Sequence, residues 1–118
     1  MIRTLLISLF LAGGAQAQQA VSPGTGAVLR ALDKVSGQVQ DVTLPNGTQI
    51  DLGRLTIAVA ACRFPRGNPN GDAFAFMVIS EVGKDAPVFQ GWMIASAPAL
   101  NAMDHSRYDV WVLRCTTS

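Results

Sequence analysis

Short apolar runs alternate with tight polar turns along most of the chain. From residue 27 onward, stretches rich in Val, Leu, Ile and Thr are separated by Gly, Pro, Asn or Ser. Runs of this composition bounded by turn-forming residues are typical of β-strands. The pattern predicts strands over residues 27–35, 37–44, 48–52, 54–62, 73–82, 88–96 and 107–115.

The runs at 73–82 and 88–96 are mostly apolar at both alternating sets of positions, as expected for strands that are central in a packed sheet. Residues 97–104 have the length of one or two helical turns, with Ser96 as a cap and Pro98 in the first turn. Strands do not alternate with long helices, which disfavours a Rossmann-type fold. We therefore predict an all-β fold, a single small β-sandwich or barrel of about seven strands with one short helix before the last strand.

Asn46-Gly47 is the sharpest local signal in the chain. Both residues tolerate the positive φ that a two-residue hairpin turn requires, so we expect a hairpin there. Asn46-Gly47-Thr48 also matches a glycosylation sequon, but the turn explains the same residues without a eukaryotic secretory pathway.

The first 17 residues have the three-part layout of a secretory signal peptide. Arg3 precedes an apolar run over residues 4–12, and small residues end at Ala17, where we expect cleavage. The apolar run is too short to span a bilayer, and no later segment is a membrane-span candidate. We assign residues 1–17 to the signal peptide, 18–26 to a flexible leader and 27–118 to the β domain.

Charge argues against several classes of partner. The chain is 49% hydrophobic and 14% charged, and part of the apolar excess lies in the signal peptide. Loss of residues 1–17 removes Arg3 and leaves eight basic and eight acidic residues, so the mature chain is formally neutral. A neutral domain lacks the basic footprint of proteins that bind nucleic acid or anionic lipid.

Cys62 and Cys115 are the two cysteines of the chain. An exported chain with an even number of cysteines favours a disulfide, and two cysteines allow one intramolecular pairing, Cys62–Cys115. Two free thiols or a redox pair are the alternatives. The redox alternative is weak because there is no C-x-x-C spacing to lower a thiol pKa.

Strict alternation along residues 107–115 predicts a core face formed by Trp111, Leu113 and Cys115. The same reasoning places Cys62 on one face with Ala58 and Ala60, which would leave room for the Trp111 ring. We therefore expect the two cysteine-bearing strands to lie close together, tied by the disulfide.

His105, the only histidine, lies in the predicted loop before the last strand. A hydrolase would need a nucleophile beside it and a group to orient it, and no G-x-S-x-G sequence is present. Zinc needs three or four ligands, and one His with two bridged Cys does not supply them, so we predict no metal and no cofactor. We expect His105 to hydrogen-bond a backbone carbonyl or to cap the C-terminus of the short helix, although a role in a pocket or in catalysis stays open.

Several stretches together resemble a known family. They are LDKVSGQVQDVTLPNGTQIDLGRLTIAVAAC, the GWM-x-A-S-x-P-x-L run at 91–100 and the H-x-x-YDVWV-x-x-C run at 105–115. Over residues 28–115 the chain resembles the small exported bacterial proteins grouped as domain of unknown function 2155, found mainly in alphaproteobacteria. The resemblance implies a Gram-negative, periplasmic setting and a cysteine pair. It implies no established activity, cofactor or catalytic residue.

Three functional hypotheses follow. The first is a non-enzymatic periplasmic module that binds an unidentified envelope protein or ligand. Its candidate interaction surface comprises Trp92, Met93, Pro98, Leu100, Met103, His105 and Tyr108, although the apolar members would equally suit a core.

The second hypothesis is an enzyme acting on envelope glycans or lipids, with His105 assisted by Asp104, Asp109 or Tyr108. The third is a small-molecule site inside a barrel, which would require a sizeable apolar cavity. We favour the non-enzymatic module.

Overall fold

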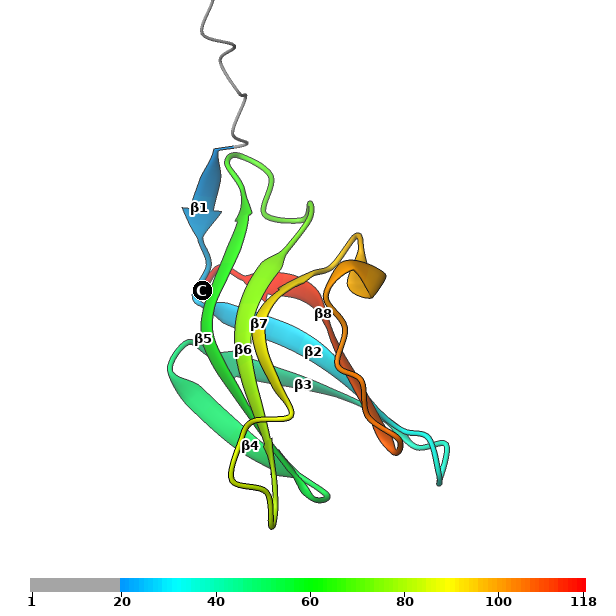
Figure 1. Cartoon of the computed structure of the whole chain (residues 1–118). Coiled ribbons are helices and arrows are strands. Elements are labelled where there is room, and N and C mark those ends of the chain that lie inside the picture. Colours follow the sequence, from blue (N-terminus) through cyan, green and yellow to red (C-terminus); the bar gives the residue numbers. More distant parts are fainter. Residues whose placement is uncertain (1–19) are drawn as a thin grey trace, which may run out of the picture.

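The structure, a computed structural model, describes residues 20–118, which form two antiparallel β-sheets packed face to face (Figure 1). The first sheet has the order β1-β5-β6-β7, with β4 paired to the first half of β5, and the second has the order β3-β2-β8. The first sheet comprises β1 (Val21–Pro23), β4 (Thr48–Leu52), β5 (Leu55–Pro65), β6 (Phe74–Glu81) and β7 (Phe89–Ile94). The second comprises β2 (Gly26–Asp33), β3 (Val39–Pro45) and β8 (Tyr108–Thr116).

The two sheets make an all-β sandwich and not a closed barrel. Strands β5, β6 and β7 lie in front of β2 and β3 in Figure 1, and the strands of the second sheet run across those of the first. The core between the sheets is apolar, and Leu29, Ile57, Met77 and Val112 are among its fully buried side chains. The all-β prediction is confirmed, and the sandwich is the correct one of its two alternatives.

Two segments differ from their predicted local structure. Residues 18–26 were expected to form a flexible leader, but Val21–Pro23 pairs with the end of β5, and Gly26 begins β2. Residues 97–104 were expected to be helical, but only a single 3₁₀ turn, η1 (Pro98–Leu100), forms. Pro98 does lie in its first turn, whereas Ser96 does not cap it: the Ser96 hydroxyl donates to Asp72 Oδ2 at 2.6 Å instead.

Asn46 and Gly47 form a turn, but not the predicted hairpin. Strands β3 and β4 on either side of the turn belong to different sheets, so the turn carries the chain across the sandwich. Gly47 adopts a φ of +79°, and the Asn46 amide donates to the Gly24 carbonyl at 2.9 Å. Gly47 is therefore the one residue of this pair at positive φ, and Asn46 holds the turn through its side chain.

A disulfide between Cys62 and Cys115 ties the sheets together. It joins β5 of the first sheet to β8 of the second, and both cysteines are buried. Gly24 packs directly on this bridge, because a Cβ at that position would lie 3.0 Å from Cys115 Cβ and 2.8 Å from the Thr116 carbonyl oxygen. The predicted pairing is confirmed.

The faces predicted for the two cysteine-bearing strands are wrong. In β8, Tyr108, Val110 and Val112 are buried and Trp111 is only partly covered. Val28 pairs with Arg114 and Leu29 with Val112, which leaves Leu113 as an extra residue in a β-bulge. The bulge shifts the alternation by one position, so Cys115 points inward although Trp111 and Leu113 do not.

The predicted signal peptide, residues 1–17, lies outside the described residues. In the part of the chain that the structure describes, no helix has the length and apolar character needed to span a membrane.

Candidate functional site

The outward surface of the first sheet is mostly apolar across part of β5, β6 and β7, beside a polar row formed by Asp51, Thr56 and Ser80. Antiparallel sheets that face water on one side usually alternate apolar inward with polar outward side chains. In β6, Ala75, Met77 and Ile79 are buried in the core, yet Phe74, Phe76 and Val78 occupy the outward positions and are partly exposed. We call the following set the aromatic face: Val21, Ala58, Ala61, Arg63, Phe74, Phe76, Val78, Gln90, Trp92 and Ile94.

Strand register places most of these side chains in three rows across β5, β6 and β7. Arg63 is opposite Phe74, which is opposite Ile94. The second row is Ala61, Phe76 and Trp92, and the third is Ala58, Val78 and Gln90. Arg63 and Gln90 are thus the only polar side chains of the nine in these rows.

The first two rows contact each other around the indole ring of Trp92. The rings of Phe76 and Trp92 meet in a T-shaped arrangement, with centroids 5.4 Å apart and planes at 71°. The Arg63 guanidinium lies over the indole, 5.0 Å from its centroid. Beside them is an open recess of about 370 Å³ lined by Val21, Arg63, Phe74, Trp92 and Ile94.

The outward surface of the second sheet provides a contrast within the same molecule. Arg30 on β2 forms a bidentate pair with Asp41 on β3, at 2.8 and 3.0 Å. Arg114 on β8 is exposed, as is Thr43 on β3. Trp111 on β8 lies opposite Arg30 in the same row, so this outward surface mixes charged and apolar side chains, whereas the rows across β5, β6 and β7 are mostly apolar.

The predicted interaction surface does not form one patch. Trp92, Pro98 and Leu100 are exposed, with Leu100 at 75%. Met93, Met103 and Tyr108 instead belong to the core, at 2%, 5% and 7% exposed. Of the predicted set, Trp92 is the member that lies on the aromatic face. Phe74, Phe76 and Ile94 are not among the residues predicted from the sequence, although the apolar character of both faces of these strands is visible in it.

His105 is fixed by hydrogen bonds on both ring nitrogens. Nδ1 lies 3.0 Å from the backbone nitrogen of Arg107 and 3.1 Å from that of Tyr108, and both N–H groups donate to it. Nε2 lies 3.0 Å from Glu81 Oε1. Since Nδ1 accepts, the proton belongs on Nε2, which donates to the carboxylate. His105 therefore positions the loop that enters β8, but it accepts from backbone N–H groups and neither donates to a backbone carbonyl nor caps a helix as predicted.

Glu81 is the carboxylate that faces His105, in place of the predicted Asp104 or Asp109. Its side chain is 10% exposed, and its Oε2 lies 2.9 Å from Lys84 Nζ. The pKa of Glu81 is held below its ordinary value first by Lys84 and then by His105. Both ring nitrogens of His105 are engaged, and none of the hydrogen-bond partners found for the ring is a hydroxyl nucleophile. The arrangement lacks the geometry of an acyl-transfer site.

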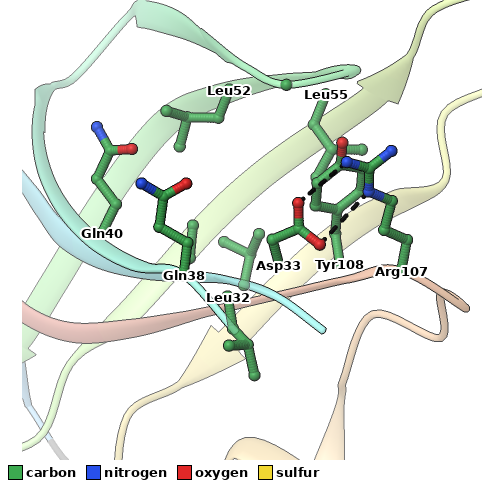
Figure 2. A pocket seen from close by; sticks show the side chains of 11 residues that line it. Leu32, Asp33, Gln38, Gln40, Leu52, Leu55, Arg107 and Tyr108 are labelled. Carbon is green, nitrogen blue, oxygen red and sulfur yellow. Dashed lines mark hydrogen bonds and ion pairs between the residues drawn. The ribbon is translucent and has the colours of Figure 1, made fainter. Parts of the chain in front are cut away.

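A small cleft lies at the open end of the sandwich near this cluster (Figure 2). Arg107 pairs with Asp33 across its rim, at 3.1 Å, and its guanidinium lies 5.1 Å from the centre of the Tyr108 ring. The hydrogen bond from Arg107 lowers the pKa of Asp33. The cleft measures about 130 Å³, which is below the usual size of a small-molecule site. Its charged residues satisfy one another, so it provides a weak basis for ligand recognition.

Among residues 20–118, no group of three or more His, Cys, Asp and Glu side chains is placed to hold a metal ion.

The geometry defines a class of protein: a two-sheet β-sandwich, bridged between its sheets by a buried disulfide, with a mostly apolar patch on the outer face of its first sheet. Residues 27–115 match the family model described as "Uncharacterized protein conserved in bacteria (DUF2155)". The chain belongs to this family.

A curated relative is the uncharacterized protein RP359 of Rickettsia prowazekii (strain Madrid E). It is 27% identical over 94 residues, which cover 77% of this chain and 61% of the relative. The chain thus spans less than two thirds of the length of that relative. No solved structure matches the chain.

Proposed function

We propose that this protein is exported to the periplasm and acts there as a non-enzymatic binding module of the cell envelope, with the aromatic face as its contact surface. The observation that carries the proposal is the pattern of β6. Its sequence is that of a strand covered on both sides, and the described chain covers only the side that bears Met77 and Ile79. A second molecule would complete the burial of Phe74 and Phe76.

The residue types on the aromatic face support a binding role. Trp and Arg dominate the energetic centres of protein interfaces, and here Trp92 and Arg63 are stacked within a mostly apolar patch. A single exposed apolar residue is ordinary, whereas a contiguous patch spread over neighbouring strands indicates an interaction site. On the opposite outer surface, the ion pair of Arg30 and Asp41 lies beside Trp111 and interrupts the apolar side chains.

Two observations support export. Residues 1–17 have the layout of a cleavable signal peptide. The Cys62–Cys115 disulfide is of the kind that persists in oxidising compartments such as the bacterial periplasm.

The test compares two tryptophans on opposite outer faces. Tagged wild-type, Trp92→Ser and Trp111→Ser chains are expressed in the native envelope, solubilised gently and sized by gel filtration. We expect wild type and Trp111→Ser to elute in an assembly larger than the isolated chain, and Trp92→Ser to elute at its own size. Elution of wild type as the free chain, or equal assemblies from both variants, would refute the proposed contact surface.

A further inference from the structure

The charged end of the aromatic face indicates what kind of partner it takes, on the assumption that the proposed contact surface is correct. Arg63 lies at one end of the face, and Arg66 follows directly after β5 at the same end. Both are exposed, and neither forms an ion pair among residues 20–118. By contrast, Arg30 and Arg107 each pair with an aspartate.

The nearby carboxylate of Asp72 forms no ion pair with Arg63 or Arg66. Asp72 precedes β6, and its two oxygens accept hydrogen bonds from the Ser96 hydroxyl at 2.6 Å and from two backbone N–H groups at 2.9 Å. These bonds outweigh burial, so the pKa of Asp72 is lowered and the group is ionised at neutral pH. It is bound to the loop after β7 and leaves Arg63 and Arg66 available to an external anion.

We propose that the partner is a protein segment that places an aliphatic or aromatic side chain in the recess beside Trp92 and an Asp or Glu carboxylate on Arg63. The recess of about 370 Å³ has room for one or two side chains. Its lining is apolar except for Arg63, whose planar fork matches a carboxylate in a bidentate geometry. The indole would stay stacked on the guanidinium and hold it in position.

Two other kinds of occupant, a glycan and an anionic lipid surface, fit the recess less well. A glycan stacked on Trp92 would need hydrogen-bonding groups around the ring, and the neighbours Val21, Phe74 and Ile94 supply none from their side chains. An anionic lipid surface is recognised by clusters of about four to eight Lys or Arg, and this end carries two. An acidic and apolar peptide satisfies both the charge and the lining.

The test places a photoreactive benzoylphenylalanine at Gln90, an exposed position on the aromatic face outside the recess. A matched control carries it at Thr43, an exposed position of the opposite sheet. Cells are irradiated intact, and the crosslinked peptide is identified by mass spectrometry. We expect a discrete adduct from position 90, absent from position 43, whose partner peptide has an Asp or Glu within a few residues of an apolar side chain.

Charge variants in the same background then test Arg63 directly. We expect Arg63→Glu to lower the adduct yield roughly tenfold, because it reverses the charge. Arg63→Lys should lower it by a smaller factor, because lysine keeps the charge but loses the bidentate fork. The control Arg114→Glu reverses one exposed charge on the opposite sheet and should leave the yield unchanged. Thermal melting of each purified variant verifies that it folds.

The outcomes separate the two proposals. Two results would overturn the partner chemistry and leave the contact surface standing. One is an adduct whose yield is unchanged by Arg63→Glu. The other is an adduct with a glycan, a lipid, a second copy of this chain or a peptide without acidic residues. Absence of any adduct at position 90 would overturn both.

Discussion

The indole ring of Trp92 packs edge to face on Phe76, 5.4 Å between centroids, on the side of the sheet that the described chain leaves open. This pair contributes some stability by itself, because T-shaped aromatic pairs are favourable by about 0.5–1.5 kcal/mol. Its position outside the core separates its contribution to folding from its proposed role in binding, and the two can be measured independently.

The first prediction concerns that separation. Trp92→Ser should lower the free energy of unfolding by about 1 kcal/mol, since it removes an aromatic pair and a cation–π contact at the surface. Met77→Ala, on the inward side of β6, should cost about 2–5 kcal/mol, because Met77 is fully buried. Urea unfolding of both variants measures the difference. Equal losses would mean that the indole is a structural element of the fold.

The second prediction concerns the inter-sheet bridge. Cys62 and Cys115 are 53 residues apart, and closing a loop of that length in the unfolded chain gives a stabilisation of about 4 kcal/mol in the chain-entropy model. The double variant Cys62→Ala, Cys115→Ala should lose that amount in oxidising buffer. In strong reductant the free energy of unfolding of wild type should fall to that of the variant. A wild-type urea unfolding curve that reductant does not change would contradict this.

The third prediction concerns the acid limb, by which we mean the fall in the free energy of unfolding at low pH. Lys84 and His105 hold the pKa of Glu81 below its ordinary value of 4.5, with Lys84 contributing most. The folded state thus binds this proton less tightly than the unfolded state, so the contribution is complete above about pH 4.5 and is lost as the pH falls through the lowered value. Glu81→Gln should therefore lose less stability than wild type between about pH 6 and pH 3.

Denaturant midpoints at a series of pH values give the two slopes. Asp33 and Asp41 also have lowered pKa values, owing chiefly to hydrogen bonds from Arg107 and Arg30, so a shallower acid limb should persist in the variant. Parallel curves for wild type and Glu81→Gln would show that the ion pair contributes nothing to the acid limb.

The fourth prediction is a coupling between Gly53 and Tyr108. Gly53 has a φ of +57°, and a Cβ there would lie 2.5 Å from Tyr108 Oη. Gly53→Ala should cost about 1–3 kcal/mol through backbone strain and this clash. In a Tyr108→Phe background the clashing oxygen is absent, so the cost of Gly53→Ala should be smaller. A double-mutant cycle by chemical unfolding measures the coupling, and strict additivity would rule the clash out.

The strands and the disulfide partners were predictable because local composition and cysteine count carry that information. The inward faces of β5 and β8 were not. Each strand has one extra residue at a β-bulge, Ala60 in β5 and Leu113 in β8. Each bulge residue comes two positions before the cysteine, so the residues before it point to the opposite face from the one predicted. A bulge depends on how two distant strands pair, and alternation within one strand does not reveal it.

The aromatic face was predictable in one respect only. The apolar character of both sides of β6 and β7 is visible in the sequence and predicts strands central in a sheet; this is right for β6 and wrong for β7, which is an edge strand. The sequence does not show which side the second sheet covers. That side was decided by long-range packing, which buried Met93 and Met103 and left Trp92 at the surface.

The most direct measurement of the central claim is hydroxyl-radical footprinting of the two tryptophans, in the native envelope and in the purified chain. Both rings are at least partly accessible in the structure, and Trp92 is 36% exposed. If the aromatic face is a contact surface, oxidation of Trp92 should fall several-fold in the envelope while oxidation of Trp111 stays the same. Equal oxidation of Trp92 in both preparations would contradict the account.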